Sequence, residues 1–259
     1  MEDNTIVLDP GDDGEVVKEF TMAGKLISEK AVNRGGVKNI LRKAWMEIGE
    51  VRIPDAPDNV FVFSMKKKEI MDQILEESPW SAMGQLVNLK QWEPSEALED
   101  IDFSKVAFWI QVHGLNRDLL TKKNAERIGA SLGKVVEVEN PVGDGGLVRG
   151  FLRCRVEIDL ADPLKDGFWV PCSNGDRRWA SLRYEKLSDC CYNCGCIGHS
   201  EKMCDEEPVV AIYDPELLRY GPWMRTAAVR KISEDIPPTV KGGKGNDARE
   251  ANRQIWRVG

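Results

Sequence analysis

The sequence predicts an α+β protein made of two blocks and a short cysteine-rich segment. Three observations carry this prediction. Before residue 95, apolar residues change between strand-like and helix-like spacing in the order β-α-β-β-α-β. After residue 104, strand-like alternation dominates. Cysteines then cluster between positions 190 and 204.

The first block is expected at residues 19–94, after an acidic lead-in at 1–18 that is predicted to be disordered. A strand at 22–27 precedes a helix whose apolar stripe includes Val37, Leu41 and Trp45. Strands follow around 51–53, ended by Pro54, and at 60–63. A second helix at 67–77 and a strand at 86–89 complete the block. This order is the ferredoxin-like arrangement that RNA-recognition modules also use.

The second, β-rich α+β block is expected at residues 104–187, after an acidic run at 95–102. It begins with a strand at 108–112 and a helix at 122–132, which Thr121 and Gly133 cap. In the long strand at 152–160, Arg153 and Arg155 alternate with apolar residues and are therefore expected to point to solvent. A hairpin turning at residues 173–175 leads to a strand at 179–184. The two blocks could be an internal duplication, although no residues match well enough to establish one.

The bulk composition narrows the function classes. A formal net charge of −7 argues against tight non-specific binding through a broad basic surface. No apolar run approaches the roughly 18 residues of a membrane helix, and the acidic N-terminus is unlike a signal peptide. The odd count of seven cysteines fits a reducing compartment. We therefore expect a soluble, intracellular protein with no membrane partner, in the nucleus or the cytoplasm.

The cysteine-rich segment at 190–205 has the spacing C-x2-C-x4-H-x4-C. Two cysteines separated by two residues hold a zinc ion through one tight turn, and Gly195 and Gly198 stand where the loop must turn. Cys190 and Cys196 fall outside this register. One structural zinc is expected, supplying the folding energy of a segment with almost no apolar core. Its four predicted ligands are Cys191, Cys194, His199 and Cys204. The tail at 206–259 is expected to be largely unstructured after about residue 235.

Further motifs surround this segment, in a fixed order. They are AGKL at 23–26, ESPW at 77–80, FWIQVHG at 108–114, VEID at 156–159, YEKL at 184–187 and YGPWMR at 220–225. The cysteine segment resembles retroviral Gag zinc knuckles of the CCHC type. The whole set resembles plant proteins derived from LINE-type retrotransposons, in which a Gag-like domain of unknown function precedes one knuckle. The resemblance implies binding of RNA or single-stranded DNA and no catalysis.

Candidate nucleic-acid contacts lie in and before the knuckle. Tyr192 can stack a base, and Lys202 is the lone basic residue of the loop. A stripe of arginines is expected either to contact phosphates or to be simply solvated: Arg149, Arg153, Arg155, Arg177, Arg178 and Arg183. Phe61 and Phe63 share one strand face, which is interpreted as core, with base stacking as the alternative. His113 is expected to be a structural turn residue, and Trp80, Trp92, Trp109 and Trp223 to be core anchors.

Two functions are considered, and the first is the one we expect, with the second as its alternative. The first is zinc-dependent, sequence-tolerant binding of single-stranded RNA or DNA. The second is a protein-interaction or assembly module, which also allows self-association. The net negative charge and the acidic residues Asp205, Glu206 and Glu207 favour the second. An enzyme is not expected, because there is no G-x-S-x-G motif and Gly242-Gly-Lys-Gly245 lacks the spacing of a phosphate loop. No small-molecule substrate is expected either.

Overall fold

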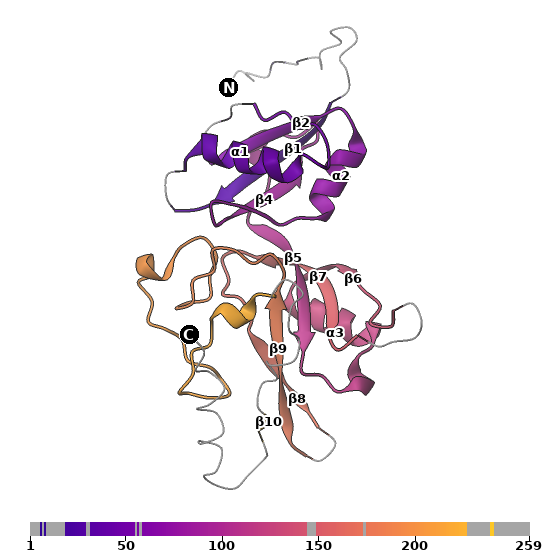
Figure 1. The fold of residues 1–259 in the computed structure, drawn as a ribbon, viewed down its shortest axis with the longest axis vertical. Coiled ribbons are helices and arrows are strands. Elements are labelled where there is room, and N and C mark those ends of the chain that lie inside the picture. Colours follow the sequence, from indigo (N-terminus) through magenta and orange to yellow (C-terminus); the bar gives the residue numbers. More distant parts are fainter. Residues whose placement is uncertain are drawn as a thin grey trace, which may run out of the picture.

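The computed structural model describes residues 6, 8, 19–29, 32–54, 56, 59–143, 149–172, 175–226 and 239–240. They form two blocks that follow one another along the longest axis of the molecule, each built on an antiparallel sheet (Figure 1). The predicted α+β class is confirmed. Most of the expected disordered lead-in, residues 173 and 174 of the expected hairpin turn, and nearly all of the expected unstructured tail lie outside the described residues.

The first block has the ferredoxin-like arrangement. Its elements are β1 (Phe20–Ile27), α1 (Arg34–Trp45), β2 (Val60–Met65), α2 (Lys68–Glu76), β3 (Trp80–Ala82) and β4 (Gln85–Gln91). The strand order is β2-β1-β4-β3, with β1 antiparallel to both of its neighbours. The strand expected at 51–53 is reduced to a single bridge between Arg52 and Ser64. Pro54 limits this edge strand because proline has no N–H to donate to a ladder.

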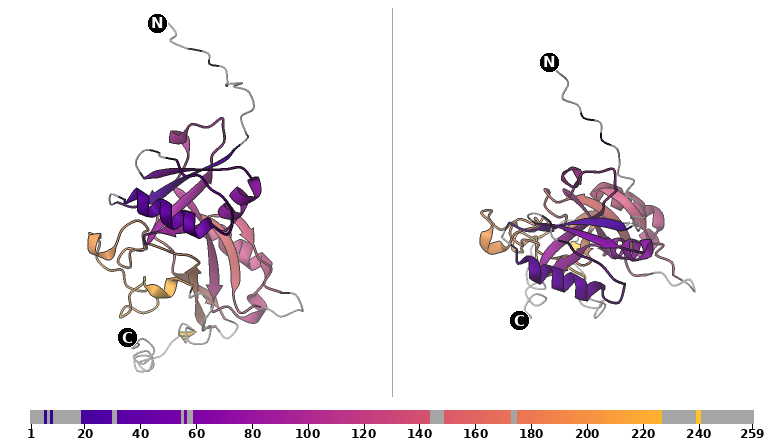
Figure 2. Two further views of the ribbon diagram at one scale, coloured as in Figure 1. Left: turned by 45° about the horizontal axis from the view of Figure 1, so that its top comes forward. Right: turned by 90° about the horizontal axis from the view of Figure 1, so that it is seen from above.

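Helices α1 and α2 both lie on one side of the first sheet (Figure 2). Val37, Leu41 and Trp45 of α1 are buried there, as the stripe predicts. Phe61 and Phe63 are each 0% exposed and belong to the same core. The interpretation of this pair as core is therefore confirmed.

The second block repeats much of this strand order. Its elements are β5 (Lys105–His113), α3 (Lys122–Leu132), β6 (Lys134–Val138), β7 (Leu152–Asp159), β8 (Gly167–Pro171), β9 (Arg177–Tyr184) and β10 (Thr239–Val240). Across the second sheet the order is β9-β5-β7-β6. Across the first sheet, β4, β1, β2 and the bridge at Arg52 follow one another in the corresponding order. Strand β8 pairs with β9 as β3 pairs with β4 in the first block, and among the described residues no α-helix lies between β7 and β8, where the first block has α2. Short 3-10 helices occur at Leu98–Asp100, Arg117–Leu119, Glu201–Met203 and Pro222–Met224.

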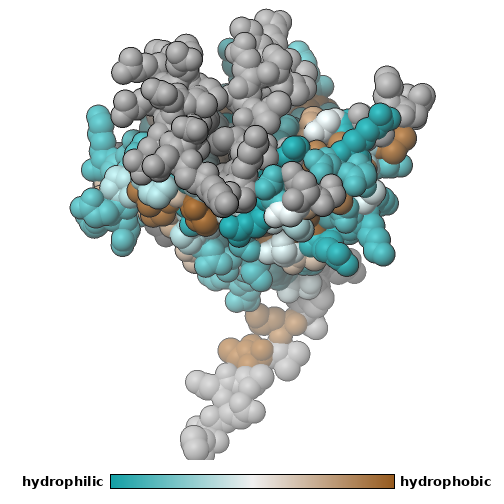
Figure 3. Space-filling model, turned by 90° about the horizontal axis from the view of Figure 1, so that it is seen from below, coloured by the Kyte–Doolittle hydropathy of each residue, from teal (hydrophilic) through white to brown (hydrophobic). Residues whose placement is uncertain are grey.

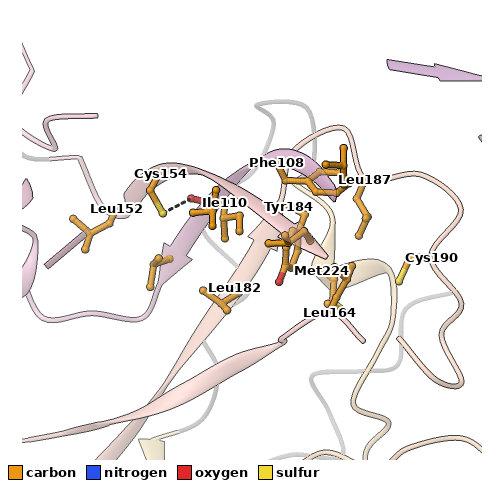
Figure 4. Packing of buried hydrophobic residues seen from close by; sticks show 14 of the residues in the cluster. Phe108, Ile110, Leu152, Cys154, Leu164, Leu182, Tyr184, Leu187, Cys190 and Met224 are labelled. Carbon is orange, nitrogen blue, oxygen red and sulfur yellow. Dashed lines mark hydrogen bonds between the residues drawn. The ribbon is translucent and has the colours of Figure 1, made fainter. Parts of the chain in front are cut away.

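One face of the second sheet is the core of this block. Ile110 of β5, Cys154 of β7 and Leu182 of β9 project into it, and their neighbours are drawn in Figure 4. Helix α3 packs on this face closely: a Cβ at Gly129 would lie 3.0 Å from the Val135 side chain. The predicted caps of α3 are confirmed, since the Thr121 hydroxyl accepts a hydrogen bond from the Asn124 N–H at 3.2 Å and the helix ends at Gly133.

The helix-free face of the first sheet packs against the second block. On β4, Leu86 belongs to the second core, and the Asn88 side chain donates to the Phe103 and Lys105 carbonyls at 3.0 and 2.9 Å. From the other side, Arg155 Nη2 donates to the carbonyls of Leu75 and Ser78, at 2.8 and 3.3 Å, at the end of α2. These contacts join the two blocks through β4 and α2.

The expectation that Arg155 points to solvent is wrong. The alternation along β7 is as predicted, but the first block covers the polar face at this position and leaves Arg155 only 9% exposed. Burial lowers the pKa of Arg155, partly offset by the charges of Glu137 and Glu76. A phosphate contact through Arg155 is therefore blocked in this arrangement.

Candidate metal centre and the neighbouring sheet face

The four predicted zinc ligands lie together in the orange part of the chain beside the second sheet (Figure 1). The thiols of Cys191, Cys194 and Cys204 and a ring nitrogen of His199 all lie within 4.8 Å of one another. Zn–S bonds of about 2.3 Å set ligand separations of roughly 3.8 Å in a tetrahedron. The side chains need to close only slightly around an ion, so the residues present fit zinc.

The backbone of the segment holds the ligands in tight turns. The Cys191 N–H donates to the Cys196 carbonyl, and the Gly195 N–H donates back to the Cys191 carbonyl, both at 2.8 Å. Gly195 has φ +82° and Gly198 has φ +112°, a region that side chains adopt at a cost. Backbone hydrogen bonds thus close the turn that holds Cys191 and Cys194.

The thiols of this site differ in their environment. Burial raises the pKa of Cys191 to about 11 and raises that of Cys194. A hydrogen bond with His199 lowers the pKa of Cys204. Thiolates are the form that binds zinc, so loading this site releases protons.

The knuckle is packed into the second core, contrary to the expectation that it has almost no apolar core. Cys190 and Ile197 are 7% and 9% exposed and belong to the core cluster together with Tyr220. Cys190, which is spare in the ligand register, therefore has a packing role, and burial raises the pKa of its thiol to about 12. The expectation missed this because Tyr220 and Met224, which complete the packing, follow the knuckle in sequence.

Gly195→Ala tests this packing. A Cβ at Gly195 would lie 2.3 Å from the Tyr220 ring, whereas Gly84, with φ +81°, has no atom within 4 Å of the same position. Backbone strain alone costs about 1–2 kcal/mol at such sites. In urea denaturation, we expect Gly84→Ala to lower the free energy of unfolding by about that amount. Gly195→Ala should lower it by at least about 2 kcal/mol more. Equal losses in the two variants would contradict the packing of Tyr220 on the knuckle.

The predicted arginine stripe does not form one surface. Arg149 and Arg153 both pair with Glu139. Arg177 is exposed and lies over the Trp169 ring at 5.1 Å, on the β8–β9 hairpin. Arg178 and Arg183 are half-buried on β9. Ion pairs with carboxylates thus occupy part of this set of arginines, so fewer of them are available to phosphates than the sequence predicts.

In the knuckle, the two predicted contact residues differ in exposure. Lys202 is exposed, within the 3-10 helix Glu201–Met203. Tyr192 is half-buried against the second core, with the Arg225 guanidinium 5.6 Å from its ring centre. Part of the Tyr192 side chain therefore remains accessible.

The polar face of the second sheet holds two aromatic residues, Trp109 and His113, whose positions differ from those predicted. Trp109 does not join the core: it lies on the opposite face from Phe108 and Ile110 and is half-buried. The Arg153 guanidinium lies 3.7 Å from the Trp109 ring centre. Beside this pair, the rings of His113 and Phe151 stack at 4.9 Å with an angle of 26°.

His113 sits in this face as a neutral ring. Burial, and then the charge of Arg183, lowers its pKa to about 4. Its Nε2 lies 3.0 Å from Gln111 Oε1. His113 is at the end of β5 and not in a turn, which corrects the sequence-based expectation.

The depressed pKa predicts an acid-sensitive contribution to stability. The unfolded ring titrates near pH 6.5, so the contribution of neutral His113 is complete above that pH and is lost as the pH falls toward 4. The loss amounts to at most about 3 kcal/mol. Urea denaturation of the parent and of His113→Gln between pH 7 and pH 4 measures this loss. The free energy of unfolding should fall less in the variant than in the parent. Parallel declines would show that His113 is not buried as a neutral ring.

Comparisons with known protein families match two segments of the chain. Residues 17–100 match the family described as a domain of unknown function, DUF4283, and residues 158–206 match the family described as zinc knuckle. No curated protein matches significantly.

The chain also shows weak similarity to solved structures. The RNA-binding domain of Hrp1 in complex with RNA shows 16% identity over 52% of this chain and 79% of that chain, with a TM-score of 0.25. A Sxl-lethal protein/RNA complex shows 14% identity over 64% of this chain and 99% of that one, with a TM-score of 0.25. The C. elegans NONO-1 homodimer shows 11% identity over 73% and 68%, with a TM-score of 0.27. These scores are too low to support a functional argument.

No helix among the described residues is both long and apolar enough to cross a membrane. The chain therefore combines a segment similar to DUF4283 with a zinc knuckle that follows it, an order that fits a Gag-like architecture.

Proposed function

We propose that this chain is a non-enzymatic, zinc-dependent binder of single-stranded nucleic acid, of the Gag-like type found in LINE-type retrotransposons. The observation that carries the proposal is the Cys3His cluster, whose ligand atoms already lie within 4.8 Å of one another. Because Cys190 and Ile197 seat the cluster in the second core, the knuckle has a fixed position relative to the sheet. The knuckle, which packs against the core face of the second sheet, and the polar face of that sheet are two separate candidate contact regions.

The charges of the knuckle and of the polar sheet face favour base stacking over phosphate contacts. Arg153 is held by Glu139 and Glu185, and Asp205, Glu206 and Glu207 are exposed beside the last ligand. Few cations are left for phosphates, while base stacking contributes about 1–3 kcal/mol per base whatever the salt. We therefore expect sequence-tolerant binding with a shallow salt dependence, about one to two units of log–log slope.

Tyr192→Ala tests the knuckle's share in this binding. Loss of one stacked base should weaken binding of a single-stranded RNA by roughly 5- to 150-fold, with zinc content unchanged. Tyr192→Phe, which keeps the ring, is the matched control and should bind like the parent. Fluorescence anisotropy at several salt concentrations measures both. Equal binding by Tyr192→Ala would remove the knuckle from the interface.

A second function, a protein-interaction module, is favoured by one specific observation. Val210 and Leu218 face each other across a bridge after the knuckle and are 52% and 46% exposed, and Ile212 is 59% exposed. In the view from below, the hydrophobic residues on the coloured surface lie in small separate patches (Figure 3). If the parent binds no oligonucleotide, this hairpin becomes the first candidate contact, and Ile212→Ser should then abolish partner binding or self-association.

A further inference from the structure

The polar face of the second sheet carries two stacked pairs of planar groups side by side. One pair is Arg153 over Trp109, at 3.7 Å, and the other is Phe151 on His113, at 4.9 Å. In the register of β5 and β7, Gln111 is opposite Arg153, which places the two pairs on adjacent rungs. The opposite face of the same strands is the core shown in Figure 4. The pairs therefore lie on the face that no helix of this block covers.

These positions are the ones from which RNA-recognition modules stack bases. Such modules use the order 4-1-3-2 and present aromatic residues from the two central strands. Here the central strands are β5 and β7, in the order β9-β5-β7-β6. Arg149-Gly150-Phe151 matches the first three positions of the signature K/R-G-F/Y-G/A-F-V-x-F/Y, and Arg153 stands at its aromatic fifth position.

Arg153 can replace that aromatic residue as a stacking surface. Arginine guanidinium planes stack bases in RNA complexes. Nε and Nη2 of Arg153 both donate to the Glu185 carboxylate at 2.7 Å, and Nη1 donates to Glu139. These bonds use the edge of the guanidinium and hold its position over Trp109. The carboxylates also neutralise its charge, so the group serves as a flat surface more than as a phosphate ligand.

The two sheets differ in how much of this face the other block covers. The corresponding face of the first sheet is occupied by the second block, through Leu86, Asn88 and Lys90. In the second block, the side chains that contact the first block include Arg155 and Glu157, one and two rungs beyond Arg153. Lys186, just after β9, also contacts it: Nζ donates to the Glu77 carbonyl and lies 4.6 Å from the Trp80 ring centre. The hydrogen bonds and ring contacts of Arg153 and Phe151 themselves are made within the second block.

We propose that this face, with Phe151 and Arg153 as adjacent stacking positions, binds two successive bases of single-stranded nucleic acid. Residues two apart on a strand lie about 6.8 Å apart, which suits bases that are separated from one another along an extended strand. The inference rests on the proposed function and names a second contact besides the knuckle.

The test uses the full zinc-loaded chain and fluorescein-labelled 12-mers of uridine RNA, thymidine DNA and a duplex. Phe151→Leu keeps an apolar side chain but removes the ring, and Arg153→Lys keeps the charge but removes the plane. Each should weaken binding of the single strands about tenfold with an unchanged salt slope, whereas duplex binding stays weak throughout. Phe20→Leu, another half-buried phenylalanine, in β1, is the control and should bind like the parent. Thermal melting confirms that each variant is folded.

Ultraviolet crosslinking of the unmodified protein to the uridine 12-mer provides an independent readout. Adducts on the peptide that contains residues 149–153 support the proposal. Adducts confined to the knuckle peptide, with Phe151→Leu binding like the parent, overturn it and leave the proposed function standing. If the parent binds no single strand at all, both fail.

Discussion

Removal of zinc is expected to destabilise the whole second block, not the knuckle alone. Cys190, Ile197 and Tyr220 connect the metal segment to the core formed by β5, β7 and β9. A ligand present at a thousand times its dissociation constant stabilises the folded state by about 4 kcal/mol. We expect a chelator to lower the free energy of unfolding by at least about that amount in urea denaturation followed by tryptophan fluorescence.

Two cysteine variants provide the control for this result. Cys194→Ser removes one ligand and should reproduce the effect of the chelator. Cys172→Ser removes a cysteine that lies outside the cluster and should leave both zinc content and stability unchanged. An unfolding transition that is the same in zinc-free and zinc-loaded protein would contradict the coupling of the knuckle to the core.

Loss of the Arg155 side chain is the second large expected effect. Arg155 donates to two carbonyls at the C-terminal end of α2, where the helix dipole favours a positive charge. Arg155→Met leaves buried carbonyls without that donor. We expect a loss of about 2–3 kcal/mol in the free energy of unfolding.

Arg177→Met is the matched control for Arg155, because Arg177 is exposed on the β8–β9 hairpin. Its effect should stay within about 0.5 kcal/mol. Limited proteolysis adds a second readout, since loosening of the two blocks should expose the segment between β4 and β5 in Arg155→Met only. If both arginine variants are equally stable, Arg155 does not join the blocks.

Local patterns predicted most of the secondary structure. The stripe of α1, the caps of α3 and the alternation of β7 depend on residues near one another in sequence, and all three are present. Strand β6 was missed because its alternating residues are mostly exposed, with no buried apolar face to give a signal. The edge strand before Pro54 was expected at full length and forms one bridge only.

The environment of each sheet face could not be predicted in the same way. Alternation shows that Arg153 and Arg155 share a face but not that the first block covers one of them, because that contact joins residues about 80 positions apart. The carboxylates that hold Arg153, Glu139 and Glu185, come from separate segments. The Arg149-Gly150-Phe151 motif is visible in the sequence, whereas the alternative of base stacking was assigned to Phe61 and Phe63 in the first block.

The central claim is that zinc loading makes the chain competent to bind single-stranded nucleic acid. Its most direct test is a titration of zinc into metal-free protein, with zinc content and anisotropy of a labelled single-stranded RNA followed together. We expect binding to rise with zinc and to reach its plateau at one equivalent per chain, with Cys194→Ser remaining at the starting value. Full RNA binding by protein that contains no zinc would contradict the claim.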